Sequence, residues 1–494
     1  MRVTLTGHAG LLIESAGRSI LCDPWFEPAY FASWFPFPDN DSIDRARLAR
    51  PTYLYISHLH HDHFDAGFLA RHVAKDAEVL LPDLPTNHLR RALECLGFHR
   101  FIETSNGTPI ELDGLRVMSC TAGTPADGPL GDSTLSVDDG EVRVVDHNDC
   151  RPRDVDALLA FGSYDAHFLQ YSGAIWYPMT YRFDDATIDT LGRQKREGQM
   201  ARALRYAQAV GAANVSPFAG PPAFLDEELF HLNDINDDPA NIFVDQRAFL
   251  RYLAEQGVEQ GRLMVAGSEA LIHPGVFEVR HALSEEELIA LFEDKLSYLS
   301  AYRERRRPQI AAITGAWIED GPDVIPALAE WWEPLLAAAD HLCARMGPIV
   351  LDLGADVVLV DPVARSVRRW SGEDREHRFT IDRRLVRSLI ARHVDDWVNE
   401  LFLSRRFTAE RTGPYNDAVF TFFKCLSADR IAYAEAALTP TVAAPNPAEG
   451  VSRRLSSDDR APFEVWQCGA RLVQRWCPHL GADLCRSPTS TETS

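Results

Sequence analysis

The chain has 494 residues, 46% of them hydrophobic, and a formal net charge of −22 at pH 7. This length predicts two to three domains with substantial cores, and the acidic balance argues against nucleic acid, whose phosphates are bound by clustered Lys and Arg. No apolar run reaches the ~18 residues of a membrane span, so no membrane partner is expected. Nine scattered cysteines and the lack of a leader-like N-terminus predict a cytoplasmic protein.

An apolar run at Tyr53–Ile56 predicts a buried strand, and the most informative motif follows it directly. The motif has the spacing H-x-H-x-D-H and runs from His58 to His63. A strand that ends in a tight loop can aim His58 and His60 to one side and Asp62 and His63 to the other. The spacing therefore predicts two adjacent metal positions, and Asp62 and His63 are also the candidate catalytic residues.

The surroundings of this motif resemble the metallo-β-lactamase fold, and the first strands are similar to the branch that contains ascorbate-6-phosphate lactonase. The residues that carry the likeness are Gly7-His8 and Asp23-Pro24, which face the metal loop in that branch. The resemblance implies that His8 and Asp23 orient metal-bound histidines, and that Asp149 is the carboxylate that bridges two metals. It also implies an αββα sandwich over residues 1–275, in keeping with a helix predicted at Asn87–Leu96 and a strand predicted at Gly261–Gly267.

The metal site departs from the zinc hydrolase pattern in one respect. A hydrolase of this fold takes a third histidine for the first metal from the segment before the bridging strand, but no histidine lies between His99 and His147. Asp127 or His147 is a candidate replacement, and Asp226 or His231 is a candidate for the last ligand of the second metal. This ligand set is compatible with one or two ions of either iron or zinc.

Several later segments are similar, in residue type and order, to CMP-N-acetylneuraminate hydroxylase. That resemblance implies a monooxygenase in which a Rieske [2Fe-2S] cluster feeds electrons to iron, with a small anionic or sugar-nucleotide-like substrate. It also implies a possible electron-transfer protein or reductase as a partner. The matching segments are Asp132–Val137, Asn148–Pro152, Ser172–Ala174, Tyr177–Tyr181, Ser216–Gly220, Asn236–Pro239 and Leu385–Phe423.

The C-terminal part is predicted to hold a mostly helical region, a linker and a Rieske fragment. The helical region covers residues 276–438, with a strand pair inserted at Ile349–Leu353 and Val357–Val360. Residues 439–459 are rich in Pro, Ala and Ser and predict the linker. Two short strands are predicted within residues 460–494, at Phe463–Gln467 and Leu472–Trp476.

This last segment leads into Cys477-Pro478-His479, one Cys–His pair of the kind that binds half of a Rieske cluster. No second Cys-x-x-His follows, so we expect a truncated Rieske domain that holds a [2Fe-2S] cluster only if it is completed.

Two basic segments are candidate anion sites. One precedes Pro308 and comprises Arg303 and Arg305–Arg307, where a solvated helix end is the favoured interpretation. The other follows the loop Ser172–Tyr181, whose small and aromatic residues suit a pocket; it comprises Arg193, Lys195, Arg196, Arg202 and Arg205.

Two functions remain open from the sequence. The first is the Rieske-coupled, metal-dependent monooxygenase that the resemblance implies. The second is a zinc-dependent hydrolase of a lactone, ester or phosphodiester, in which the metal lowers the pKa of a bound water to about 7.

Overall fold

The computed structural model describes residues 1–122, 131–152, 155–173, 175–235, 238 and 241–438. Beyond these it describes the backbone of three short strands, β20 (Arg453–Arg454), β21 (Val465–Cys468) and β22 (Arg471–Gln474), which pair as an antiparallel sheet. The two strands predicted near the C-terminus correspond to β21 and β22. Asp127, Cys477 and His479 lie outside the described residues, as does most of the predicted linker.

The N-terminal domain is built on two sheets. The eight-stranded sheet has the order β14 (Val276–Arg280), β13 (Glu269–His273), β1 (Arg2–Gly7), β2 (Gly10–Ser15), β3 (Arg18–Cys22), β4 (Tyr53–Tyr55), β5 (Glu78–Leu81) and β6 (Phe101–Glu103). The six-stranded sheet has the order β12 (Val215–Phe218), β11 (Ala166–Gln170), β10 (Arg143–Asp146), β9 (Asp132–Asp138), β8 (Leu115–Ala122) and β7 (Ile110–Leu112).

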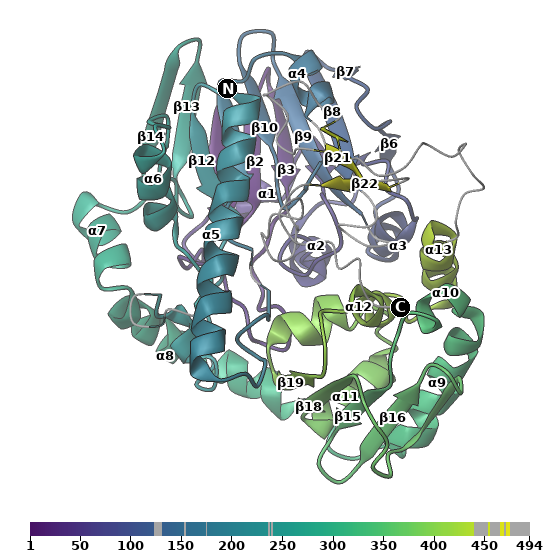
Figure 1. The fold of residues 1–494 in the computed structure, drawn as a ribbon. Coiled ribbons are helices and arrows are strands. Elements are labelled where there is room, and N and C mark those ends of the chain that lie inside the picture. Colours follow the sequence, from purple (N-terminus) through teal and green to yellow (C-terminus); the bar gives the residue numbers. More distant parts are fainter. Residues whose placement is uncertain are drawn as a thin grey trace.

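The inner faces of these sheets share one hydrophobic core, in which Val3, Leu11 and Tyr55 of the first sheet meet Val137 and Phe168 of the second. The outer faces are covered by helices, as alternating apolar residues on each strand require. The predicted αββα sandwich is therefore confirmed (Figure 1). The helices are α1 (Arg45–Leu48), α2 (Ala66–His72) and α3 (His88–Cys95) beside the first sheet, and α4 (Asp156–Phe161), α5 (Asp185–Val210) and α6 (Gln246–Glu255) beside the second.

Two local predictions have different outcomes in this domain. The helix expected at Asn87–Leu96 is α3, with Asn87 and Leu96 as its end positions. The strand expected at Gly261–Gly267 is wrong: Gly261 forms a single bridge with Val215, and strand β13 begins only at Glu269. Its apolar residues Met264 and Val265 are buried in an irregular segment instead of a strand, so burial alone produced the apolar pattern.

A C-terminal domain follows two connecting helices, α7 (Glu285–Glu293) and α8 (Lys295–Gly315). The expected strand pair is present as β15 (Ile349–Asp352) and β16 (Val357–Asp361), but it belongs to a five-stranded sheet. The remaining strands are β17 (Ser366–Arg369), β18 (His377–Ile381) and β19 (Phe407–Arg411). The helices are α9 (Val324–Ala338), α10 (Asp340–Cys343), α11 (Arg383–Arg392), α12 (Asp417–Lys424) and α13 (Ala428–Leu438), with a π-helical turn at Val398–Phe402.

The extra strands have alternating buried and partly exposed residues, with arginine on the outer positions. In β18, for example, His377, Phe379 and Ile381 are buried while Arg378 lies between them. The length of only four or five residues and the arginines hide this alternation in the sequence. Helix α8 also differs from expectation, because it continues through Pro308, which removes a single N–H, and buries Ile310 beyond it.

The two domains are joined by polar and apolar contacts. Trp34 Nε1 donates to the carbonyl of Leu403 at 2.9 Å, and Tyr181 forms a parallel bridge with Ala409. Trp25 and Trp176 of the first domain share a core with residues of the second, and α5 runs alongside the sandwich toward that domain (Figure 1). None of the described helices is both long and apolar enough to cross a bilayer.

Candidate metal centre

The metal loop begins where β4 ends, and Asp23 fixes its shape from the end of β3. The Ser57 backbone N–H donates to Asp23 Oδ1 at 2.8 Å, and the Ser57 hydroxyl lies 2.6 Å from Oδ2. Asp23 Oδ2 also lies 2.8 Å from His63 Nδ1, and the Nε2 of that imidazole points toward Asp62 and Asp149. This is the orienting contact to a histidine that the resemblance implied for Asp23.

The loop side chains form two groups of converging ligand atoms. In the first group, one ligand atom each of His58, His60 and Asp149 lie within 4.8 Å of one another. In the second group the same holds for His8, Asp62 and His63. Asp149 Oδ1 is also 3.6 Å from His63 Nε2, so this carboxylate lies between the groups. All five residues expected to bind metal are thus brought together.

His8 has a more direct position than expected. It was assigned an orienting role, but its Nε2 lies 2.9 Å from Asp62 Oδ2 and its ring is among the ligand atoms of the second group. The strand β1 ends in a turn where Gly7 has a φ of 120° and His8 a φ of 49°, and this turn aims the imidazole at the loop. His8 is therefore a candidate for the missing last ligand of the second metal.

The other candidates for missing ligands lie elsewhere. His147 Nδ1 is 2.9 Å from His167 Nε2, and the His147 ring packs against Tyr206. Asp226 pairs with Arg406 at 3.1 Å, while His231 lies in the 3₁₀ turn Phe230–Asn233. Within the described ranges, none of the three joins either ligand group.

Asp132 is a site residue that the sequence analysis missed. It is buried at the start of β9, and its Oδ1 lies 3.1 Å from His58 Nδ1. The contact repeats the relation of Asp23 to His63, because each carboxylate touches the Nδ1 of one loop histidine. Burial raises the pKa of Asp132 to about 7. Its segment was noticed only for its likeness to a family, and no spacing rule links it to residue 58.

Unpartnered buried atoms support a metal-binding interpretation. His58 Nε2, His63 Nε2 and Asp149 Oδ1 are buried and have no hydrogen-bond partner among the described residues. Leaving such groups unpaired costs ~1–3 kcal/mol each, so a ligand that uses all three is expected. Burial, reinforced by His63, lowers the pKa of His58 to about 3, which keeps its imidazole in the neutral form that binds metal.

Two further contacts hold the loop. The Tyr30 hydroxyl donates to Asp62 Oδ1 at 2.6 Å from a turn in which three successive residues, Tyr30, Phe31 and Ala32, have positive φ. His61 Nε2 lies 2.7 Å from Glu400 of the π-helical turn, and Glu400 also pairs with Arg392. The C-terminal domain therefore contacts the metal loop directly, which no local pattern in the sequence could indicate.

A cavity of about 180 Å³ opens at the two ligand groups, where the domains meet. Its acidic and histidine lining consists of Asp132 and residues of the two ligand groups. The loop Ser172–Tyr181, which was expected to form a pocket, contributes to the wall with Ser172, Trp176 and Tyr177. The C-terminal domain contributes Val398, Asn399, Leu403, Tyr415, Phe420 and Lys424.

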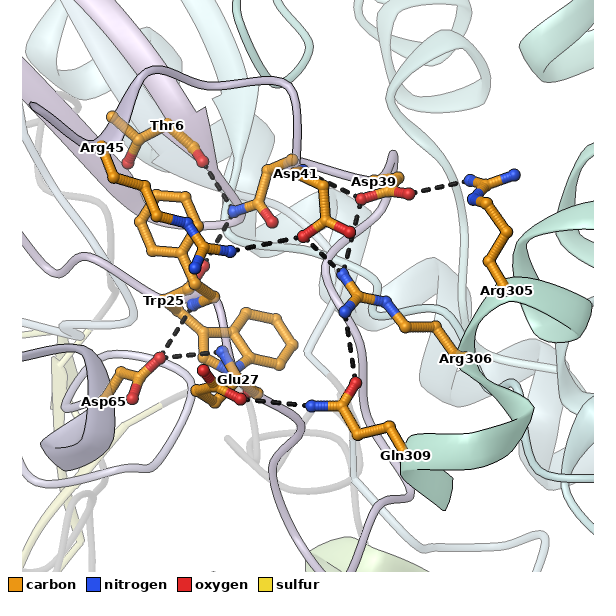
Figure 2. Close-up of polar contacts among 12 residues, drawn as sticks. Thr6, Trp25, Glu27, Asp39, Asp41, Arg45, Asp65, Arg305, Arg306 and Gln309 are labelled. Carbon is orange, nitrogen blue, oxygen red and sulfur yellow. Dashed lines mark hydrogen bonds and ion pairs between the residues drawn. The ribbon is translucent and has the colours of Figure 1, made fainter. Parts of the chain in front are cut away.

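The two basic segments have different environments. From α5, Lys195 and Arg202 line the cavity together with Arg151, and burial and the nearby Arg151 lower the pKa of Arg202 to about 9. Figure 2 shows the other segment, where Arg305 lies 2.8 Å from Asp39 and Arg306 2.7 Å from Asp41. The solvated helix end expected there is wrong, because α8 continues to Gly315 and its Arg305 and Arg306 form ion pairs with the loop after β3.

Comparison with known proteins identifies both domains. The family model described as "Beta-lactamase superfamily domain" matches residues 2–170, and the one described as "Rv3818-like, SCP2-like domain" matches residues 324–439. The Mycobacterium tuberculosis H37Rv protein named "Putative Rieske 2Fe-2S iron-sulfur protein Rv3818" is 45% identical over 98% of this chain and 92% of its own length. The chain belongs to the Rv3818-like family. A member of this family from Mycolicibacterium smegmatis is 44% identical over the same shares of the two chains.

Solved structures are more distant from this Rv3818-like chain. Igni18, a metallo hydrolase from Ignicoccus hospitalis, is 17% identical with a TM-score of 0.36, covering 57% of this chain and 99% of its own. CmlA, a diiron β-hydroxylase from Streptomyces venezuelae, is 16% identical with a TM-score of 0.35, covering 55% of this chain and 54% of its own.

Proposed function

We propose that the protein is a metal-dependent oxygenase that hydroxylates a small anionic molecule, as the likeness to CMP-N-acetylneuraminate hydroxylase implies. The observation that carries the proposal is the donor set, in which the first group offers two imidazoles, of His58 and His60, and the carboxylate of Asp149. Two histidines and a carboxylate leave positions open for oxygen and substrate, the arrangement of many non-haem iron oxygenases. The Rieske name of the family's mycobacterial members supports the same class.

Under this proposal the first group holds one metal ion and the second group, His8, Asp62 and His63, holds another. Bound iron supplies the one-electron and oxygen chemistry that side chains lack. The chain's own contribution is to fix the ligands. Asp23 and Asp132 hold the Nδ1 atoms of His63 and His58, so that each ring presents its Nε2 in a fixed direction.

The cavity wall would bind and position the substrate. Trp34, Trp176 and Phe420 exclude water and hold an apolar body, while Arg151 and Arg202 attract an anionic group. Water exclusion also protects an oxidising centre from side reactions.

Electrons would come from a Rieske cluster. Cys477 and His479 provide one Cys–His pair, and a [2Fe-2S] cluster requires two such pairs. We propose that a second Cys–His pair completes the cluster, or that a separate electron-transfer protein or reductase supplies the electrons.

Zinc-dependent hydrolysis is the second candidate, favoured by the match of residues 2–170 to the β-lactamase superfamily. Bound zinc would activate water for attack on a lactone, ester or phosphodiester. In this case the cations of the wall would hold the anionic part of the same kind of substrate.

The two functions are separated by comparing iron and zinc forms of the full chain. The iron form, prepared anaerobically and given ascorbate as reductant, should consume oxygen when anionic test substrates are added. The zinc form should hydrolyse lactones and phosphodiesters weakly at most. His58→Ala should abolish the oxygen uptake, and Arg193→Gln, an exposed change on α5, should leave it intact. Rapid hydrolysis by the zinc form that His58→Ala removes, with no oxygen uptake by the iron form, would establish the hydrolase instead.

A further inference from the structure

The cavity wall carries more positive charge than the rest of this acidic chain would suggest. Four cations line the cavity, Arg151, Lys195, Arg202 and Lys424, and they come from three separate elements. The chain as a whole has a net charge of −22, so their collection in one cavity is a local feature.

The carboxylates of the same cavity are engaged elsewhere. They are Asp62, Asp132 and Asp149, which belong to the ligand groups or touch a ligand histidine. Metal binding would use the negative charge of these carboxylates, so that it would no longer balance Arg151 and Arg202. Neither Arg151 nor Arg202 forms an ion pair with any other residue in the described part of the chain, and Arg151 Nε is buried without a hydrogen-bond partner there.

Two arginines beside each other in a partly desolvated wall are costly unless an anion accompanies them. Burial and Arg151 lower the pKa of Arg202, which means that its charged form is destabilised where it stands. Guanidinium groups present paired N–H donors that match a carboxylate or phosphate. Gln199 Oε1 also lines the cavity, buried and unpartnered among the described residues, and as an acceptor it suits an N–H or O–H of the ligand instead of its anionic group.

The rest of the wall is aromatic. Trp34, Trp176, Tyr177 and Tyr181 line the cavity from the first domain, and Tyr415 and Phe420 line it from the second. Tyr415 and Phe420 stack with an interplanar angle of 8°, which provides a flat surface for a ring.

We propose that the substrate is a ring-bearing acid whose anionic group is held by Arg151 and Arg202 and whose ring packs on the aromatic wall. The inference rests on the proposed function only in placing the reacting atom of the substrate at the metal; the binding of its anionic group and ring does not depend on it. The anionic group is a carboxylate or a phosphate, which share the geometry that a guanidinium pair recognises.

Calorimetric titration of the zinc-loaded full chain tests the proposal without turnover. Phenylacetate and phenyl phosphate represent the two anions, and phenylacetamide is the neutral match. We expect at least one anion to bind at least about tenfold more tightly than the amide, and Arg202→Gln to remove that difference. The variant Arg202→Lys should keep part of the preference, and Arg193→Gln, on the same helix but outside the cavity lining, should keep all of it.

Equal binding of anions and amide by the wild type would overturn the proposal, and so would an anion preference that survives Arg202→Gln, since the anion would then contact the metal alone. Thermal melting confirms that each variant is folded, and a preference retained by Arg202→Lys keeps the test valid if the Gln variant unfolds. Because binding is measured without oxygen or reductant, failure of the oxygenase assay does not affect this result.

Discussion

The basic residues of α5 and those of α8 form similar clusters in the sequence, but their surroundings in the fold differ. On α8, Arg305 and Arg306 face Asp39 and Asp41 (Figure 2). The Arg306 guanidinium also lies 5.5 Å from the centre of the Tyr302 ring. On α5, Arg202 faces a cavity and another arginine. What a basic helix does is therefore decided by the residues that distant segments bring against it. Arg305 and Arg306 are paired and hold the fold, whereas Arg202, which forms no ion pair with the described residues, is available to a ligand.

The largest expected effect concerns the metal centre that shares the cavity with the α5 cations. The double change His60→Ala with Asp62→Ala removes one donor from each ligand group, so most of the bound metal should be lost. Metal content measured by mass spectrometry on the purified protein checks this, with Arg305→Gln as a control that should keep its metal. Unchanged metal content in the double variant would refute the assignment of the centre, and with it the contrast between the two helices.

A smaller but clear loss is expected on α8. Arg306→Met removes the cation that Asp39 and Asp41 share, at a place where the Arg306 side chain is only 14% exposed. It leaves Asp39 with Arg305 and Asp41 with Arg45, two more exposed partners. We expect the free energy of unfolding to fall by ~2 kcal/mol, since breaking a partly buried pair leaves the other charge behind. Urea denaturation measures it. A variant as stable as the wild type would show that these pairs do not hold the fold.

For α5 we expect a substitution of an arginine to raise the free energy of unfolding instead of lowering it. In the zinc-loaded protein, Arg202→Met removes a cation that burial and Arg151 disfavour, so stability should rise by up to ~1 kcal/mol while anion binding is lost. The same urea titration, run in parallel, gives the value. If Arg202→Met destabilises as strongly as Arg306→Met, the α5 cations are structural and the comparison fails.

The smallest effect belongs to the outer member of the α8 pair. The Arg305 side chain is 54% exposed, so its bond to Asp39 is screened by solvent. Arg305→Gln should change stability by less than ~0.5 kcal/mol, which a shift in melting temperature of at most a few degrees would report. A larger shift would mean that Arg305 and Arg306 act as one unit.

The parts of the centre that the sequence could predict are those encoded within a few residues. His58, His60, Asp62 and His63 share one loop, and the strand before it was evident from four apolar residues. The sequence did not reveal Asp132, Glu400 or the role of Tyr30, because each depends on a contact between segments that are far apart in the chain. Tyr30, for example, contacts Asp62 across 32 positions. Elsewhere in the fold, the Arg305 bond to Asp39 spans 266 positions. No periodicity records such contacts.

The sequence analysis missed most of the sheet of the C-terminal domain for a different reason. Strands β17, β18 and β19 have four or five residues each, and arginines occupy their outer positions. Helical spacing in the neighbouring α11 and α12 therefore dominated the pattern. The first domain was easier, because its strands carry Val, Ile and Leu on the faces that meet in the core.

Because the cavity lies between the domains, substitutions that affect the metal ligands and substitutions that affect part of the substrate wall fall in different domains. Every residue of the two ligand groups lies within the first 149 positions, whereas Tyr415, Phe420 and Lys424 of the wall lie in the other domain. Substitutions near α12 can therefore alter which molecule fits without touching the metal ligands. A duplicated copy could drift toward a new substrate while its chemistry stayed intact, and differences among relatives should collect on that side of the cavity first.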